Sequence, residues 1–168
     1  MSEFSFSARE LTGRVGAAKS YEREAPAPED WGTDLIGVPI GSPVDLEVTL
    51  EAAGDGIWVT GTAAYPLHGN CSRCLRDIDY DDETDFEELY FYPEHLEDDD
   101  ASAVIDDHVD LEPLLRDQVL LSLPFSPLCT PDCLGLCAEC GFNLNDDPEH
   151  AHEAATDPRW DALKDWSR

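Results

Sequence analysis

The chain has 168 residues, and 38 acidic residues against 10 Lys and Arg give it a formal net charge of −28. This length is typical of a single domain, or of one domain with a small appended module, and it suffices to bury a core. The charge argues against a protein that clamps nucleic-acid backbones or binds an anionic membrane surface, because both contacts need clustered Lys and Arg. It favours attraction to basic proteins or cations. Adaptation to high salt is the alternative explanation.

Neither a membrane span nor a signal peptide is expected. No uncharged apolar stretch approaches the roughly 20 residues of a membrane helix. The opening residues Met1-Ser2-Glu3-Phe4 lack the basic and apolar regions of a secretory signal. We therefore expect a cytoplasmic protein. In that reducing compartment we expect six clustered cysteines to be metal ligands or redox groups rather than disulfides.

Glycine and proline recur throughout residues 1–43. That density of breakers allows only short strands and turns. We expect this segment to be a wrapping arm outside the core.

Alternation with a period of two then predicts a β-hairpin. In residues 44–51 every even position is apolar and most odd positions are charged. A turn at 54–56 leads into a second alternating run over 57–67, in which Pro66 ends the pairing or marks an edge.

Residues 77–92 predict a strand with one apolar and one acidic face. Every odd position from 77 to 87 is Asp or Glu, whereas most even positions are Ile, Tyr, Thr or Phe. Carboxylates in one row repel each other, and a basic partner would relieve that repulsion. A merely solvated face is the plainer alternative. The candidate partner-binding residues are Asp45, Glu47, Asp79, Asp81, Glu83, Asp85 and Glu87.

The region after this strand holds an acidic loop and then helices. Residues 94–107 contain little that can pack, so we expect a mobile loop. Asp110 is a candidate cap for a largely buried helix that begins near Glu112 and Pro113 and stops before Pro124. Asp157 and Pro158 predict the start of a second, short helix in which the following residues share helical spacing: Trp160, Leu163 and Trp166.

The cysteines carry the strongest chemical signal. A CxxC turn, Cys71-Ser72-Arg73-Cys74, precedes four cysteines within twelve residues: Cys129, Cys133, Cys137 and Cys140. Zn²⁺ takes four tetrahedral ligands, and a two-residue spacer lets both thiolates of a turn face one ion. Such an all-thiolate set fills the coordination sphere, so we expect structural zinc rather than catalytic zinc.

Spacing leaves the ligand set open. The favoured local site uses Cys129, Cys133, Cys137 and Cys140, because it closes only short loops. A shared site would pair Cys71 and Cys74 with two of the later four, at an entropy cost that rises slowly with loop length. A second ion completed by His68, His150 or His152 is the least favoured arrangement. An iron–sulfur cluster and thioredoxin-like chemistry are weaker alternatives, because the spacings and context differ from those motifs.

Several motifs together resemble the YceD family of large ribosomal RNA subunit accumulation proteins, and in particular its high-GC Gram-positive members. The resemblance rests on Cys71-Ser72-Arg73-Cys74-Leu75, on the stretch 110–117 leading into Leu123-Pro124, on the cysteine run 127–141, on the 157–160 segment, and on residues 36–39 and 41–44. It implies a role in the synthesis, processing or stability of 23S ribosomal RNA and supplies no active site to transfer.

The residues and the resemblance together predict a non-enzymatic factor for 23S ribosomal RNA accumulation or processing, or for large-subunit assembly. A basic ribosomal or RNA-processing protein is the expected partner, with direct RNA contact second, and neither a membrane nor a small-molecule substrate is expected. Arg73 and Arg76 form the one local basic spot, for which we favour pairing with Asp77 or Asp79 over a phosphate. The alternatives are an RNA-processing hydrolase that uses carboxylates and Mg²⁺, or a structural zinc module that bridges two proteins.

The predicted fold is α+β. It comprises an antiparallel β-sheet or partly open barrel, one buried helix, a Pro/Gly-rich N-terminal arm and a cysteine-rich, zinc-binding C-terminal tail. Within a single domain overall we expect the arm at 1–43, the sheet-plus-helix core with the CxxC turn at 44–128, and the cysteine cluster with the last helix at 129–168.

Overall fold

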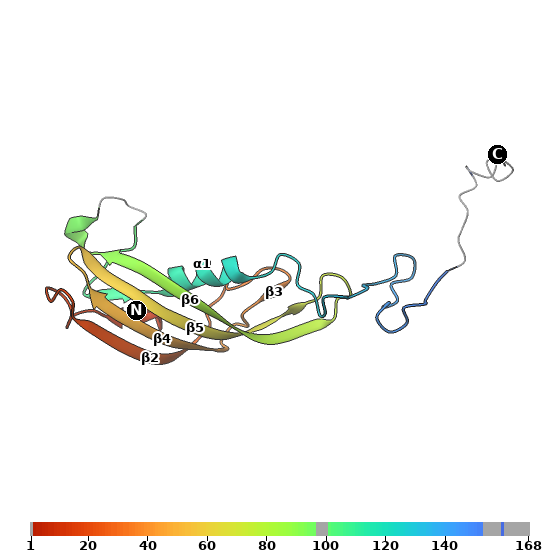
Figure 1. Cartoon of the computed structure of the whole chain (residues 1–168), viewed down its shortest axis with the longest axis horizontal. Coiled ribbons are helices and arrows are strands. Elements are labelled where there is room, and N and C mark those ends of the chain that lie inside the picture. The colour runs from red at the N-terminus through yellow and green to blue at the C-terminus, as the bar shows by residue number, and fades with distance from the viewer. Residues whose placement is uncertain (1, 97–100, 153–158, 160–168) are drawn as a thin grey trace.

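The computed structural model describes residues 2–96, 101–152 and 159. A main antiparallel sheet contains β2 (Ala18–Pro26), β4 (Pro43–Ala52), β5 (Gly56–Asn70), β6 (Asp77–Phe91) and the two-residue β3 (Ile36–Gly37). A second, two-stranded sheet pairs β1 (Ser5–Ser7) with β7 (His108–Asp110). The 3₁₀ turn η1 (Pro93–His95) and the helix α1 (Glu112–Ser122) complete the set (Figure 1). None of the described helices is long and apolar enough to cross a membrane.

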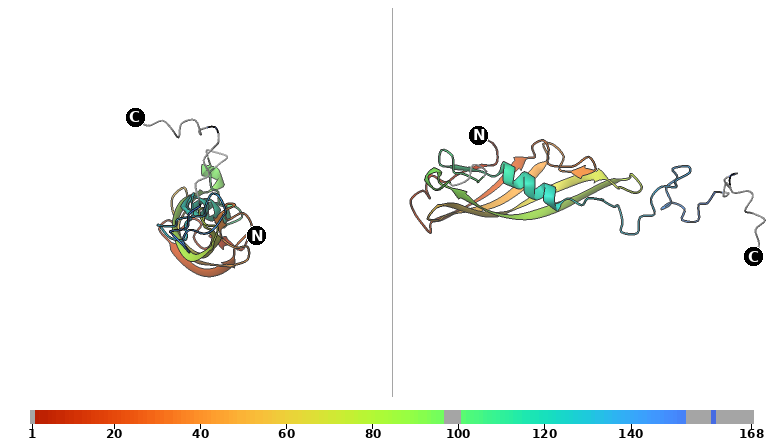
Figure 2. Two further views of the ribbon diagram at one scale, coloured as in Figure 1. Left: turned by 90° about the vertical axis from the view of Figure 1, so that its right-hand side faces the viewer. Right: turned by 90° about the horizontal axis from the view of Figure 1, so that it is seen from above.

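The strands form a curved, open sheet. Its order is β2-β4-β5-β6, and β3 occupies the far end of the same edge of β5 that pairs with β4. Figure 2 shows α1 lying across the inner face of this sheet. The described strands do not close on themselves, so the antiparallel sheet with one helix is confirmed and these strands form no closed barrel.

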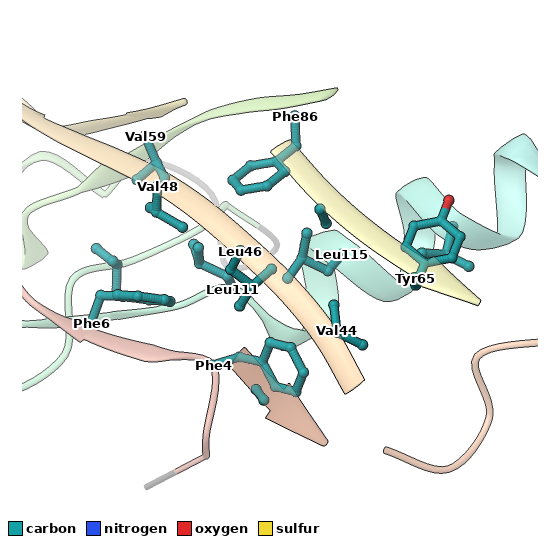
Figure 3. Packing of buried hydrophobic residues seen from close by; sticks show 14 of the residues in the cluster. Phe4, Phe6, Val44, Leu46, Val48, Val59, Tyr65, Phe86, Leu111 and Leu115 are labelled. Atoms are coloured by element: carbon teal, nitrogen blue, oxygen red, sulfur yellow. The ribbon is translucent and has the colours of Figure 1, made fainter. Parts of the chain in front are cut away.

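The period-two patterns place the core where the sequence predicts it. Val44, Leu46, Val48 and Leu50 of β4 are buried, and their odd neighbours face outward. Across β5 and β6, Gly61 lies opposite Phe86. A Cβ at Gly61 would stand 2.7 Å from the Phe86 ring, so the glycine makes room for the aromatic side chain on the inner face (Figure 3).

Pro66 lies inside β5 rather than at its end. Its cross-strand partner on β6 is Asp81. On the other edge, β4 pairs with β5 only up to Ala64, and β3 pairs from His68 onward. The proline therefore stands beside a gap in pairing, where its missing N–H costs no ladder hydrogen bond.

The N-terminal segment belongs to the core, so the prediction of a wrapping arm outside it is wrong. β2 runs alongside β4 for nine residues, and β1 pairs with β7 about a hundred positions later in the chain. Phe4, Phe6, Ala8 and Leu11 are almost fully buried. The glycines and prolines of this segment form turns between strands, and they do not prevent it from packing into the core. The domain boundaries remain predictions.

The helix forms as expected but buries only one face. The N-cap is Leu111, which makes no side-chain cap hydrogen bond, so Asp110 stands one residue before the cap position predicted for it. Asp110 Oδ1 still accepts the backbone N–H of Glu112 at 3.2 Å. Leu115 and Val119 are fully buried, whereas Leu121 is 81% exposed. The expectation of a largely buried helix is therefore wrong, because α1 lies on the sheet as an amphipathic element.

The predicted acidic loop is ordered at its end. Val104 is buried and its N–H donates to the carbonyl of Phe91 at 2.9 Å. The acidic run at 97–100 and the short helix predicted around Trp160, Leu163 and Trp166 lie outside the described residues.

Candidate metal centre

The first CxxC motif forms the tip of the β5–β6 hairpin. The backbone N–H of Cys71 donates to the Arg76 carbonyl at 2.8 Å, and that of Leu75 donates back to the Cys71 carbonyl at 2.9 Å. Leu75 closes the turn with a φ of 59°. Both flanking strands are fifteen residues long, so they carry this tip well beyond the end of β4 (Figure 1).

The chain after α1 returns to the same tip. Leu123 and Pro127 are buried, and the N–H of Ser72 donates to the Pro127 carbonyl at 2.8 Å. The hydroxyls of Ser72 and Ser126 are 2.8 Å apart. These contacts bring Cys129 and Cys133 against the hairpin tip.

Four thiols converge there in what we call the four-cysteine site: Cys71, Cys74, Cys129 and Cys133. Their sulfurs all lie within 4.8 Å of one another, with 3.7 Å between Cys71 and Cys133 and 3.5 Å between Cys74 and Cys129. Four sulfurs bound at about 2.3 Å to a tetrahedral Zn²⁺ would lie about 3.8 Å apart. A disulfide needs about 2.05 Å. The geometry therefore fits a metal and not a disulfide.

The surroundings of this site favour the thiolate at Cys71 and Cys133 but not at Cys74. At Cys74 the backbone N–H of Arg76 acts downward, yet burial and the neighbouring thiols outweigh it and raise the pKa. Burial raises the pKa of Cys71, but backbone N–H groups of Cys129, Cys74 and Arg73 outweigh it and lower that pKa to about 6. For Cys133, burial again acts upward, and the Asn145 side chain, whose Nδ2 lies 3.4 Å from the sulfur, helps to lower the pKa. Because the thiolate is the metal-binding form, these hydrogen bonds prepare the site for a cation.

A second group of ligand side chains forms further along the chain. We call it the Cys2His2 cluster, and one sulfur or ring nitrogen from each member lies within 4.8 Å of the others: Cys137, Cys140, His150 and His152. The favoured local set of four cysteines is therefore wrong, since the structure divides those four between two groups. The shared set, which spacing left open, is the one that the fold brings together.

These clusters lie inside the region that matches known proteins. The profile of the YceD family, described as "Large ribosomal RNA subunit accumulation protein YceD", matches residues 59–166, which include both groups of cysteines. The chain belongs to the YceD family. No solved structure matches it.

Individual relatives of this YceD chain are bacterial and plant proteins. Uncharacterized proteins of Mycobacterium tuberculosis and Mycobacterium bovis are each 40% identical over 158 residues, which are 91% of this chain and 76% of theirs. YlbN of Bacillus subtilis is 31% identical over 97 residues, 56% of each chain. A chloroplastic YCED homolog of Zea mays, described as a large ribosomal RNA subunit accumulation protein, is 31% identical over 70 residues, 42% of this chain and 18% of that protein.

The two arginines of the YceD CxxC turn hold the tail and do not pair with Asp77 or Asp79. Arg73 donates to the carbonyl of Cys133 at 2.9 Å, and Arg76 forms an ion pair with Asp146. Both side chains therefore connect the hairpin tip to the segment that carries the later cysteines.

Asn145 is a site residue that sequence reasoning missed. Besides its contact with the Cys133 sulfur, its Oδ1 accepts the N–H of Leu134 at 2.8 Å. An amide that bridges the Cys133 sulfur and the backbone positions this loop of the candidate metal centre. The asparagine pair Asn143-x-Asn145 soon after Gly141 was the available signal, and Asn143 in turn accepts from Asn145.

His68, once a candidate ligand, pairs instead with the acidic outer face. Its Nδ1 lies 2.8 Å from Asp79 Oδ1, and this hydrogen bond raises the pKa of His68 above its usual 6.5. We expect Asp79→Asn to lower the pKa of His68, measured by titrating its ring protons by NMR. The pair stabilises the fold below pH 6.5 and loses that contribution as the pH rises through the raised folded-state pKa. An unchanged pKa in Asp79→Asn would contradict the pairing.

Proposed function

We propose that this protein is a non-enzymatic factor for accumulation or processing of 23S ribosomal RNA, or for assembly of the large ribosomal subunit, and that it acts in the cytoplasm through a basic protein partner. Family membership is the observation that carries the ribosomal part of the proposal. The six free cysteines suit a reducing compartment. A zinc ion in the four-cysteine site would fill its coordination sphere with thiolates, so its role would be to clamp the tail onto the hairpin tip.

The acidic outer face of the main sheet supports the proposal of a basic protein partner. Acidic residues from three strands are exposed on it and form what we call the acidic face: Glu22, Glu24, Asp45, Glu47, Glu51, Asp77, Asp79, Asp81, Glu83, Asp85 and Glu87. All seven candidate partner-binding residues are among them. Their use by a partner remains a proposal.

The register sets like charges side by side. Glu22 lies directly opposite Glu47, and Glu24 opposite Asp45, on neighbouring strands. Like charges directly opposite each other destabilise a sheet. The two cations of β2 do not offset this repulsion. Lys19 pairs with Glu10, and Arg23 donates to the carbonyls of Glu3 and Ser5.

The middle of the acidic face is neutral and hollowed. On β5, Ala64, Thr62 and Thr60 lie opposite Glu83, Asp85 and Glu87. A hollow of about 260 Å³ lies on the β2–β4 side of this strip and is lined by Glu22, Glu47 and Thr62 among others. Two acidic rows that flank a strip of small side chains would suit an extended basic segment, with charge steering its approach.

Charge reversal on β6 tests the proposed face. We expect Asp81→Lys with Asp85→Lys and Glu87→Lys to abolish recovery of a basic ribosomal or RNA-processing protein with the tagged chain and to reduce 23S ribosomal RNA in cells. The matched control reverses three exposed acidic residues elsewhere, Glu29, Asp34 and Glu94, and so changes the net charge equally. Equal recovery by both variants, each correctly folded, would refute the face.

The rival functions have their own outcomes. Cleavage of precursor ribosomal RNA by the purified protein with Mg²⁺ would support the hydrolase. Among the described residues, the gathered ligand groups of three or more consist of cysteine and histidine rather than carboxylates. Normal large-subunit levels in a depleted strain would favour a zinc module that bridges proteins outside ribosome assembly.

A further inference from the structure

The Cys2His2 cluster repeats the backbone geometry of the hairpin tip in an unrelated part of the chain. The N–H of Cys137 donates to the Phe142 carbonyl at 2.7 Å, and the N–H of Gly141 donates back to the Cys137 carbonyl at 2.9 Å. Gly141 has a φ of 73°. These are the same two hydrogen bonds, and the same left-handed fifth residue, that fold the turn at Cys71. In each turn the second and third residues after the first cysteine also direct their N–H groups at its sulfur.

The donor atoms of the cluster converge. His150 Nε2 lies 3.3 Å from the Cys140 sulfur, His152 Nε2 lies 3.2 Å from that sulfur, and the two Nε2 atoms are 3.1 Å apart. With Zn–N of about 2.0–2.1 Å and Zn–S of about 2.3 Å, the edges of a tetrahedral site are about 3.3–3.6 Å for pairs that include nitrogen. The observed contacts approach that size.

Neighbouring side chains contact both imidazoles. Glu139 Oε2 lies 3.7 Å from Nδ1 of His152, the nitrogen that faces away from the cluster. A carboxylate on the far nitrogen is the usual way in which a protein orients a metal-binding histidine. The Phe142 ring stacks on His150, with centroids 4.5 Å apart and planes at 25°.

The segment that carries this cluster has no other core. The main apolar cluster takes its described members from residues 4–123, and the residues packed around the four-cysteine site reach only to Leu136. Cys140 and His152 are exposed, whereas three of the four thiols at the hairpin tip are buried. A short segment without an apolar core commonly depends on a bound metal to fold.

We propose that the Cys2His2 cluster binds a second zinc ion, that this ion folds residues 137–152, and that it is removed more readily than an ion in the four-cysteine site. The two sites share no ligand, so removal of the histidines leaves the ligand set of the four-cysteine site intact. The greater exposure of the second site gives a chelator easier access to its ion. The proposal does not depend on the ribosomal role, since metal content can be read without any partner.

Metal counting tests the site directly. We expect elemental analysis and native mass spectrometry of the full chain to find two zinc ions, and one ion in His150→Ala with His152→Ala. The control His68→Ala, a histidine that pairs with Asp79 outside both clusters, should retain two. A single ion in the wild-type chain, or two ions in the double-histidine variant, would overturn the proposal.

Thiol labelling and hydrogen exchange test the order of loss and the folding role. Under limiting chelator we expect Cys137 and Cys140 to be alkylated at least tenfold faster than Cys71 and Cys74, read by peptide mass spectrometry. In the double-histidine variant, amide protection should fall within 137–152 and remain in β4, β5 and β6. Equal alkylation rates would contradict the easier removal of the second ion. Unchanged amide protection of residues 137–152 in the double-histidine variant would contradict its role in folding that segment.

Discussion

Cys133→Ser should remove one metal ion and release the tail from the tip of the β5–β6 hairpin. Cys133 is 2% exposed and its sulfur lies 3.7 Å from that of Cys71. Because the sulfur is shielded from solvent, a water molecule cannot readily take its place as a ligand. Metal affinity falls by about 10–100-fold even when only a supporting residue is lost, and loss of a ligand should cost more. Elemental analysis should show one zinc fewer than in the wild-type chain.

The release of the tail can be followed through the remaining thiols. Cys74 and Cys129, now without an ion, should be alkylated at least tenfold faster, while far-UV circular dichroism of the sheet stays unchanged because the main core lies elsewhere. Ser72→Ala is the matched control, since it alters the same turn and its contact with Ser126 without removing a ligand. An unchanged zinc content in Cys133→Ser would rule out the shared four-cysteine site.

Phe6→Ala should destabilise the protein by about 3–5 kcal/mol, as expected for a buried Phe→Ala change. Phe6 is fully buried, its ring lies 5.3 Å from that of Tyr21, and the Arg23 guanidinium lies 4.3 Å from its centroid. Truncation would leave a cavity where β1 meets β2. Equilibrium unfolding in urea would measure the loss.

The matched control lies in the same N-terminal segment. Val15 is 74% exposed, so Val15→Ala should change the free energy of unfolding by no more than about 0.5 kcal/mol. Similar small losses in Phe6→Ala and Val15→Ala would return residues 1–43 to the status of a peripheral arm.

The ion pairs and hydrogen bonds at the hairpin tip explain why cysteine spacing predicted the wrong set of candidate metal ligands. Cys133 and Cys137 are four positions apart, yet Asn145 directs one loop toward the tip and Gly141 folds the other on itself. Loop closure over some sixty residues costs only a little more than closure over ten, because the entropy grows with the logarithm of length. The choice between a local and a shared site therefore depends on contacts such as Arg73 to Cys133, which no spacing reveals.

The wrong prediction that residues 1–43 lie outside the core has a similar origin. Glycines and prolines report the local backbone, and they correctly indicate short pieces separated by turns. The pairing of Ser5 with Asp110 and the burial of Phe4 depend on residues far along the chain. Whether such a segment is buried depends on the distant strands that it packs against, and a local sequence pattern carries no information about those strands.

Sequence patterns sufficed for the features that depend on neighbouring residues: the strands β4, β5 and β6, the acidic row on β6, the helix start near Asp110 and the grouping of cysteines as candidate metal ligands. Side chains alternate every two residues in a strand, so periodicity alone assigns them to faces. Three outcomes became visible only in the folded chain: which cysteines meet, that His150 and His152 join Cys137 and Cys140, and that residues from the first forty enter the core. Those outcomes depend on contacts between distant segments, whose energies appear only when the chain is folded.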